Sequence, residues 1–136
     1  SMVCSTTDVI AEGRKLRKRL GGGMRQVGVI AAAARVALDS GVERLAEDHA
    51  NARTLAEGLA DLDETAVDLG SVETNMVYLN LAPFGKTGPQ VADELLGEGV
   101  LTLGMAPHVM RLVTHRDVSS QDIEKALAAF AKVLRG

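Results

Sequence analysis

The chain has 136 residues, of which 46% are hydrophobic and 24% are charged, and its formal net charge is -3 at pH 7. This composition fits one modest folded domain and excludes a disordered or low-complexity chain. Aromatic residues make up only 2% of the chain, too few for a base-stacking surface, and no apolar run is long enough to cross a bilayer. The single cysteine, Cys4, excludes an internal disulfide and is typical of a reducing compartment. We therefore expect a cytoplasmic protein with no nucleic-acid and no membrane partner.

The first forty residues predict two helices separated by three glycines. Residues 2–5 fit the end of a strand, and a helix follows from residue 7 or 8 to about residue 20. Glycines 21–23 end this helix, because glycine accepts the left-handed conformation of a C-terminal cap. A second helix is expected from Met24 onward, and its many small residues predict that it is closely packed and buried.

The remaining sequence predicts a layer of helices on a small sheet. Residues 42–60 have the clearest amphipathic pattern, with His49 on the apolar face. The other expected elements are strands at 66–70, 74–82, 100–104 and 108–115, and helices at 91–98 and after a cap at Ser119. This order predicts an α+β fold with three or four mostly antiparallel strands and helices on one side.

The stretch RKLRKRLGGGMRQ, residues 14–26, places six basic residues in thirteen positions of an acidic chain. It is not a nucleotide loop of a known kind, because no Gly-Lys-Ser/Thr follows the glycines and no strand precedes them. Lys18 and Arg25 can still bind an anion together. Arg25 is expected at a helix start, where unpaired backbone N–H groups favour negative charge. The alternative from spacing alone is a solvated basic face.

Five stretches in order carry a resemblance to a known family: RKLRKRLGGGMRQVGVIAAAA, ERLAEDHANARTLAEGLA, ETNMVYLNL, GVL and RLVTHRDVSSQDIEKAL. The chain resembles low-specificity L-threonine aldolases, which are pyridoxal-phosphate enzymes of the aspartate-aminotransferase fold class. The resemblance covers essentially the whole chain but only the C-terminal part of the enzyme. It implies that residues 1–40 are the end of a large cofactor domain with connecting and interface helices. Residues 41–136 are then the small C-terminal α+β domain.

The resemblance also implies a reaction, the cleavage of a β-hydroxy-α-amino acid such as threonine to glycine and an aldehyde. In the family, the lysine that forms the Schiff base lies in a Ser-Lys-Gly motif upstream of the segment that matches residues 1–5. No lysine here has that context, so no catalytic residue is assigned and the chain alone is expected to be inactive. The implied partners are a small amino-acid substrate and further copies of the chain, as a dimer or tetramer with shared active sites.

Three residues match family active-site positions. Arg111 matches the arginine that binds the substrate carboxylate, a task that suits the planar guanidinium. Arg25 and Lys18 match basic residues that contribute to the cofactor phosphate or the substrate of a neighbouring subunit, and Arg25 is the stronger candidate. His115 is expected on the same strand face as Arg111, as a supporting group. No cluster has metal-ligand spacing.

Other assignments remain open at this point. The chain can belong to another pyridoxal-phosphate enzyme of the same fold class, such as a β-eliminating lyase. It can also be a non-catalytic anion-binding or nucleic-acid-binding module, or an oligomerisation domain. His49 is expected to pack in the core, His108 to be exposed and Cys4 to be a small apolar strand residue. The motif Thr74-Asn75-Met76 is a family landmark without an evident chemical role.

Overall fold

A computed structural model describes residues 3–136 of the chain. It divides into two compact units, Ser1–Val42 and Glu43–Gly136, and each is described by itself. Residues 3–6 form no strand and Cys4 is exposed, which corrects the prediction of a strand end there; Met2 lies outside the described residues. None of the described helices has the length and apolar character needed to cross a membrane.

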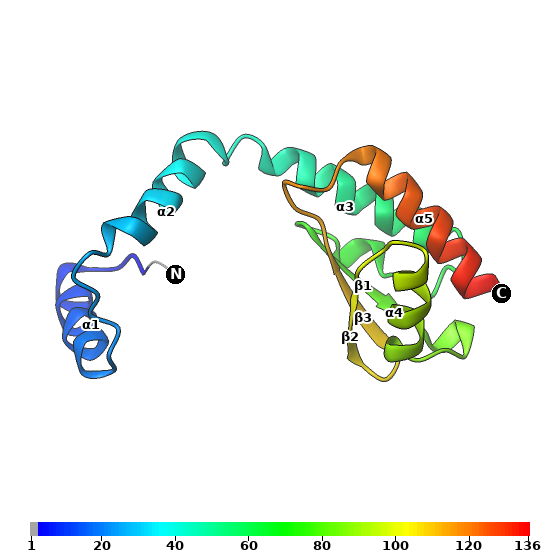
Figure 1. The fold of residues 1–136 in the computed structure, drawn as a ribbon, viewed down its shortest axis with the longest axis horizontal. Coiled ribbons are helices and arrows are strands. Elements are labelled where there is room, and N and C mark those ends of the chain that lie inside the picture. The colour runs from blue at the N-terminus through cyan, green and yellow to red at the C-terminus, as the bar shows by residue number, and fades with distance from the viewer. Residues whose placement is uncertain (1–2) are drawn as a thin grey trace. The chain divides into compact units, whose positions relative to one another are not determined.

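The first unit contains helix α1 (Thr7–Arg19) and helix α2 (Gly28–Ser40) (Figure 1). The glycines end α1 as predicted. Gly21 has a left-handed φ of 79°, its N–H donates to the Lys18 carbonyl at 3.3 Å, and the Gly22 N–H donates to the Arg17 carbonyl at 2.8 Å. This pair of hydrogen bonds is a Schellman cap, which satisfies carbonyls that the helix end leaves without partners.

Helix α2 differs from its prediction in two ways. It begins at Gly28, and the residues after Met24 form a turn, in which Val29 donates to the carbonyl of Gln26 at 3.3 Å. Within this chain α2 has no buried residue, although a buried helix was predicted. Its exposed large apolar side chains are Val29, Ile30, Val36 and Leu38.

The second unit begins with helix α3 (Leu45–Ala60), which packs against the sheet through its C-terminal half. The buried apolar residues of α3 are Ala52, Leu55, Ala56 and Leu59. His49 is exposed, so the prediction that it packs in the core is wrong. The buried residues of α3 form one stripe that starts at Asp48, and His49 stands at the edge of this stripe.

The sheet has three antiparallel strands, β1 (Met76–Asn80), β2 (Leu103–Ala106) and β3 (Val109–Val113), in the order β1-β3-β2. Strand alternation gives the sheet one buried face and one open face. The buried face carries Val77 and Leu79 of β1 and Met110 and Leu112 of β3.

The predicted strand at 66–70 does not form. Ala66 and Val67 are buried, and the Ala66 carbonyl accepts one hydrogen bond from the Asn80 N–H at 2.8 Å. The Asp68 side chain then accepts from the Gly70 N–H at 2.9 Å, which turns the chain into the short 3₁₀ helix η1 (Leu69–Ser71). The apolar residues are buried as their pattern indicates. An aspartate two residues before a glycine nevertheless favours a turn, and this turn replaces the predicted strand.

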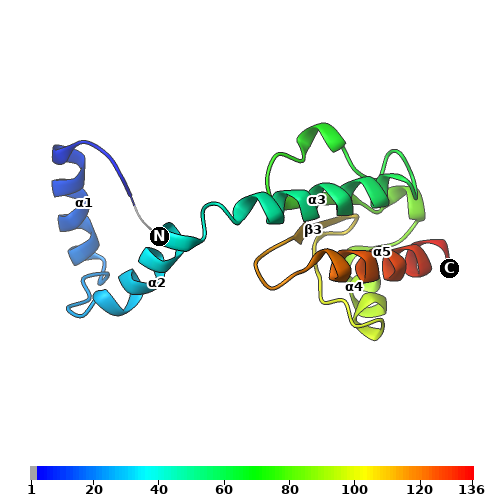
Figure 2. The same cartoon turned by 90° about the horizontal axis from the view of Figure 1, so that it is seen from above.

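Two further helices complete the core. Helix α5 (Ser120–Arg135) lies beside α3, and helix α4 (Gly88–Gly97) packs against β2 and α5, after the 3₁₀ helix η2 (Ala82–Phe84) (Figure 2). Residues of all three helices join β1 and β3 in one buried cluster. The architecture is α+β, as predicted.

The start of α4 passes very close to strand β2. A Cβ atom added at Gly88 would lie 3.0 Å from the carbonyl oxygen of Ala106 and 3.0 Å from Cα of Gly104. Because both contacts are to backbone, we expect Gly88→Ala to lower the free energy of unfolding by about 1–3 kcal/mol. The matched control is Gly97→Ala in the same helix, where the added Cβ meets nothing within 4 Å. Urea unfolding should show no loss for this control, and equal losses would contradict the prediction.

A capping box starts α5 and gives the chain a defined acid sensitivity. The Asp122 carboxylate accepts from the Ser119 hydroxyl at 2.6 Å, from Lys125 Nζ at 3.0 Å and from the Ser119 N–H at 3.1 Å. These hydrogen bonds, the one from the Ser119 hydroxyl first, lower the pKa of Asp122 to about 2. A lowered folded-state pKa stabilises the fold above the unfolded pKa, near 4, and that contribution is lost as the pH falls to about 2. The melting-temperature gap between wild type and Asp122→Ala should therefore close between about pH 4 and pH 2. A gap that stays constant would contradict this.

Candidate functional site

Arg111 lies at the centre of the open face of the sheet. It is on the middle strand, β3, directly opposite Tyr78 of β1 and Leu103 of β2. Its neighbours Met110 and Leu112 point into the core, so the alternation of the strand turns Arg111 outward. Within residues 3–136 its guanidinium has no hydrogen bond and no ion pair. The group is accessible and has its donors available.

The surroundings of Arg111 on this face are mainly apolar. Tyr78 is 50% exposed, Leu103 77%, Met76 40% and Val113 43%, and the Met76–Val113 pair lies two residues along the ladder from the Tyr78–Arg111 pair, on the same face. An apolar surround lowers the local dielectric once a ligand covers the face, which strengthens the attraction between a guanidinium and a carboxylate. This arrangement can bind a small carboxylate through two parallel N–H···O bonds.

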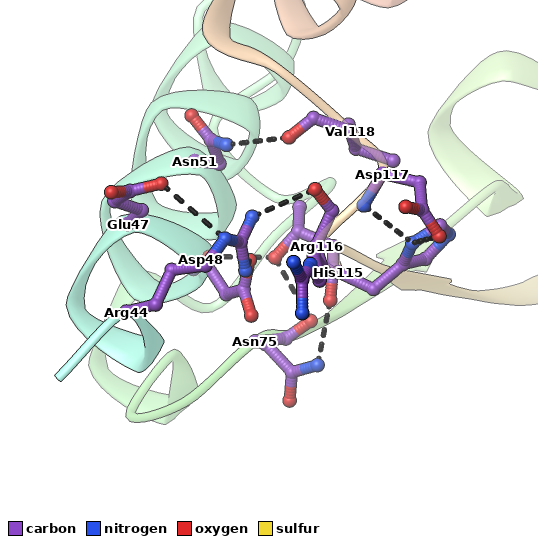
Figure 3. A network of polar contacts seen from close by, with 10 residues as sticks. Arg44, Glu47, Asp48, Asn51, Asn75, His115, Arg116, Asp117 and Val118 are labelled. Carbon is purple, nitrogen blue, oxygen red and sulfur yellow. Dashed lines mark hydrogen bonds and ion pairs between the residues drawn. The ribbon is translucent and has the colours of Figure 1, made fainter. Parts of the chain in front are cut away.

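A polar network holds the end of β3 against α3 and the start of β1 (Figure 3). Thr114 is 2% exposed, and its hydroxyl donates to the backbone carbonyl of Asp48 at 2.6 Å. Asn75 and Thr114 exchange two hydrogen bonds: Asn75 Nδ2 donates to the Thr114 carbonyl at 2.7 Å, and the Thr114 N–H donates to the Asn75 carbonyl at 3.0 Å. The strand that carries Arg111 is thus tied to two other elements immediately after it ends.

A second part of the network fixes the loop that follows. The buried carboxylate of Asp48 accepts from Arg44 Nη1 at 3.0 Å, and Arg44 Nη2 donates to the Arg116 carbonyl at 2.8 Å. Asn51 Nδ2 donates to the Val118 carbonyl at 3.0 Å (Figure 3). One arginine therefore both pairs with a buried carboxylate and donates to a loop carbonyl, so the buried charge of Asp48 has a partner.

Lys18 lies over the glycine turn of the first unit. A Cβ atom at Gly23 would be 2.8 Å from Cδ and 3.5 Å from Nζ of Lys18, and a Cβ at Gly22 would be 3.0 Å from Cγ of Arg17. The second and third glycines thus leave space for basic side chains that fold back along the turn. In the described part of the chain Lys18 has no carboxylate within ion-pair distance.

Arg25 does not lie at a helix start. It is in the turn that precedes α2, three residues before Gly28. The prediction that it lies at a helix start, beside unpaired backbone N–H groups, is therefore wrong. Its guanidinium, like Lys18 Nζ, pairs with no carboxylate among residues 3–136. Both residues belong to the first unit and Arg111 to the second.

The two histidines near β3, His108 and His115, are exposed and contact nearby backbone groups. His115 lies two residues beyond the end of β3 at Val113; it is exposed, and its Nδ1 accepts from the Asp117 N–H at 3.3 Å. Within residues 3–136 no hydrogen bond or ion pair joins His115 to Arg111, so its supporting role stays a prediction. His108 is exposed, as predicted, with Nδ1 2.9 Å from the Lys86 carbonyl. Among residues 3–136 no group of three metal-ligating side chains gathers.

Arg111 was predicted from the sequence as a site residue, and its role stays a prediction; the polar network beside it was not predicted. The spacing of Arg44 and Asp48, four residues apart on a helix, is a signal for an ion pair. The burial of Asp48 and Thr114 has no such signal, because both are polar residues in a core environment. Asn75 belongs to the Thr74-Asn75-Met76 motif, for which the sequence alone indicated no chemical role.

The helices followed by a three-stranded antiparallel sheet match the C-terminal portion of a fold-type-I enzyme. The sequence model of the beta-eliminating lyase family matches residues 1–82, and the chain belongs to this family.

Several curated proteins are similar to the chain. It is 41% identical over 134 residues to the "Probable low-specificity L-threonine aldolase 2" of Arabidopsis thaliana, covering 98% of the chain and 38% of that protein. It is 35% identical over 128 residues to the "Low specificity L-threonine aldolase" of Escherichia coli (strain K12), covering 94% of the chain and 36% of that protein. It is 30% identical over 147 residues to "Alanine racemase TOXG" of Cochliobolus carbonum, covering 99% of the chain and 35% of that protein. The chain thus spans little more than a third of the length of these relatives.

Proposed function

We propose that this chain is the C-terminal part of a pyridoxal-phosphate-dependent aldehyde-lyase. The enzyme cleaves L-threonine, allo-threonine and related β-hydroxy-α-amino acids to glycine and an aldehyde. The observation that carries the proposal is Arg111, an accessible guanidinium that pairs with no acidic side chain among residues 3–136 and lies at the centre of an open, mainly apolar sheet face. The names of the similar proteins from Arabidopsis and Escherichia coli support the substrate class.

In this proposal Arg111 binds the substrate carboxylate. Two parallel N–H···O bonds fix both oxygens of the carboxylate and therefore the rotation about Cα. That rotation decides which bond to Cα is aligned for cleavage, so holding it lowers the entropy that the reaction must lose. Tyr78 and Leu103 flank the arginine and exclude water from the carboxylate.

The basic residues of the first unit fit the anionic end of the cofactor. Lys18 and Arg25 have no carboxylate partner in the described chain, and glycine at positions 22 and 23 leaves space beside the basic side chains. We propose that they bind the cofactor phosphate or the substrate of a neighbouring subunit in a dimer or tetramer. Pyridoxal phosphate, when bound, supplies the electron sink for the pair released as the Cα–Cβ bond breaks.

The chain alone should not catalyse the reaction. None of its lysines stands in a Ser-Lys-Gly context, so it has no counterpart of the family's Schiff-base lysine. We also place the enzyme in the cytoplasm, in keeping with a single cysteine, Cys4, that is exposed and unpaired.

The experiment has two arms. The longer enzyme is incubated with L-threonine and pyridoxal phosphate, and the products are analysed. Glycine and an aldehyde support the proposal, whereas ammonia and a keto acid indicate a β-elimination and overturn it. The 136-residue chain is treated in the same way and then reduced with borohydride. Threonine cleavage, or a specific cofactor adduct on this chain, would contradict its expected inactivity.

A further inference from the structure

We propose that Asn75, Thr114 and Asp48 form a register clamp, a set of positioning residues that fixes where Arg111 stands on the sheet. This inference rests on the proposed function of Arg111. It gives the Thr74-Asn75-Met76 motif a physical role, through Asn75. None of the three residues is proposed to touch the substrate.

The pairing of β1 with β3 needs such a device. β2 and β3 are joined by Pro107 and His108 alone, and a short connection fixes the register of a hairpin. β1 and β3 are separated in the chain by η2, α4 and β2, so no turn sets their register. Their alignment must come from side chains.

The apolar pattern fixes this register only in part. A slip by one residue would turn Arg111 into the core and Leu112 outward, and burial strongly opposes it. A slip by two residues preserves both faces, because strand side chains alternate with a period of two. It would nevertheless move Arg111 along β1 by about 7 Å, away from Tyr78.

The clamp is sensitive to the slip that the apolar pattern tolerates. Asn75 and Thr114 are the next pair after Met76 and Val113, and the Asn75 side chain adds a 2.7 Å bond to the Thr114 carbonyl beyond the backbone bond. A two-residue shift would remove the Asn75 amide from this carbonyl. A buried carbonyl that loses its donor is costly, so the clamp favours one register.

Helix α3 also holds the end of β3, through a hydrogen bond between Thr114 and Asp48. Thr114 is 2% exposed and its hydroxyl donates to the Asp48 carbonyl at 2.6 Å, so a shifted strand would leave this hydroxyl buried without a partner. Arg44 holds the Asp48 carboxylate and the Arg116 carbonyl, so the chain beyond the clamp is fixed as well (Figure 3). The strand end is thus fixed against both β1 and α3.

The structural test uses the chain itself. Asn75→Ala and Thr114→Val each remove one clamp interaction, and Thr114→Ser keeps the hydroxyl as the conservative variant. Asn51→Ala is the matched control, because it removes a 3.0 Å side-chain bond between α3 and the same loop but lies outside the β1–β3 ladder. Amide exchange and cross-strand nuclear Overhauser contacts between Tyr78 and Arg111 are measured. The first two variants should exchange faster along the ladder and weaken these contacts, and the other two should match wild type.

The functional test uses the longer enzyme. Asn75→Ala and Thr114→Val should raise KM for the amino acid by roughly three- to tenfold, with kcat changed less, since each loses one hydrogen bond that positions the carboxylate site. Thr114→Ser should restore KM. An unchanged Tyr78–Arg111 contact in Asn75→Ala overturns the clamp, and so does a Thr114→Ser variant as impaired as Thr114→Val. If wild type does not cleave threonine, the proposed function fails, while the exchange data on the chain still decide the clamp.

Discussion

Replacing Arg111 with alanine in the longer enzyme is expected to lower kcat/KM for threonine by roughly 30- to 1000-fold. The Arg111 guanidinium has no polar partner in the described chain, so its donors are available for the carboxylate contact proposed above. Loss of a charge-assisted, two-point contact corresponds to about 2–4 kcal/mol of transition-state stabilisation. Steady-state kinetics with threonine measure the effect directly.

Two further variants separate binding geometry from charge. Arg111→Lys keeps the positive charge but loses the planar fork, and it should recover only part of the activity. Arg53→Ala removes an arginine whose partners are Glu57 and the Leu69 carbonyl, and kcat/KM should not change. Arg111 is exposed, so its removal should leave the unfolding transition nearly unaffected. Wild-type kcat/KM in Arg111→Ala would exclude it from carboxylate binding.

Phe130→Ala is expected to have the largest effect on stability. Phe130 lies on α5, is 1% exposed and is the largest fully buried side chain of the described residues. Its removal loses apolar burial and leaves a cavity, which together should lower the free energy of unfolding by about 3–5 kcal/mol. That is a large share of the stability of a typical small domain.

Urea unfolding followed by far-ultraviolet circular dichroism measures this loss. The control is Leu96→Ala on α4, because Leu96 is 59% exposed and its removal opens no cavity. We expect its midpoint to stay close to that of wild type. Comparable losses in both variants would mean that the cluster around Phe130 does not dominate the stability of the fold.

The sequence predicted the elements whose apolar period is long and uninterrupted. The strands around Val77 and Met110 and the capped helix after Ser119 lie where their patterns placed them. Errors occurred where local turn chemistry overrides the pattern. At Asp68 a side-chain hydrogen bond replaces a strand. At Val100 the N–H still bonds to the Leu95 carbonyl of the preceding helix, so β2 starts later than predicted.

Only the part of the candidate site that consists of a single residue could be predicted from the sequence. The place of Arg111 on a strand is readable in the sequence, and its role in carboxylate binding, which the family resemblance implies, stays a prediction. The clamp depends on Asp48 and Thr114, polar residues whose burial is decided by elements far apart in the chain. The prediction that Arg25 lies at a helix start was wrong for a different reason. Helix boundaries near glycines are set by backbone hydrogen bonds that composition does not specify.

The strand order has a consequence for synthesis. β3 is the last strand of the chain, yet β1 and β2 each pair with it and not with each other. While the chain emerges from the ribosome, both earlier strands therefore have no partner in this sheet until Val109–Val113 has been made. Unpaired strand edges invite association with other chains. The interval between β1 and β3 should be the point in biosynthesis at which this domain depends most on a chaperone.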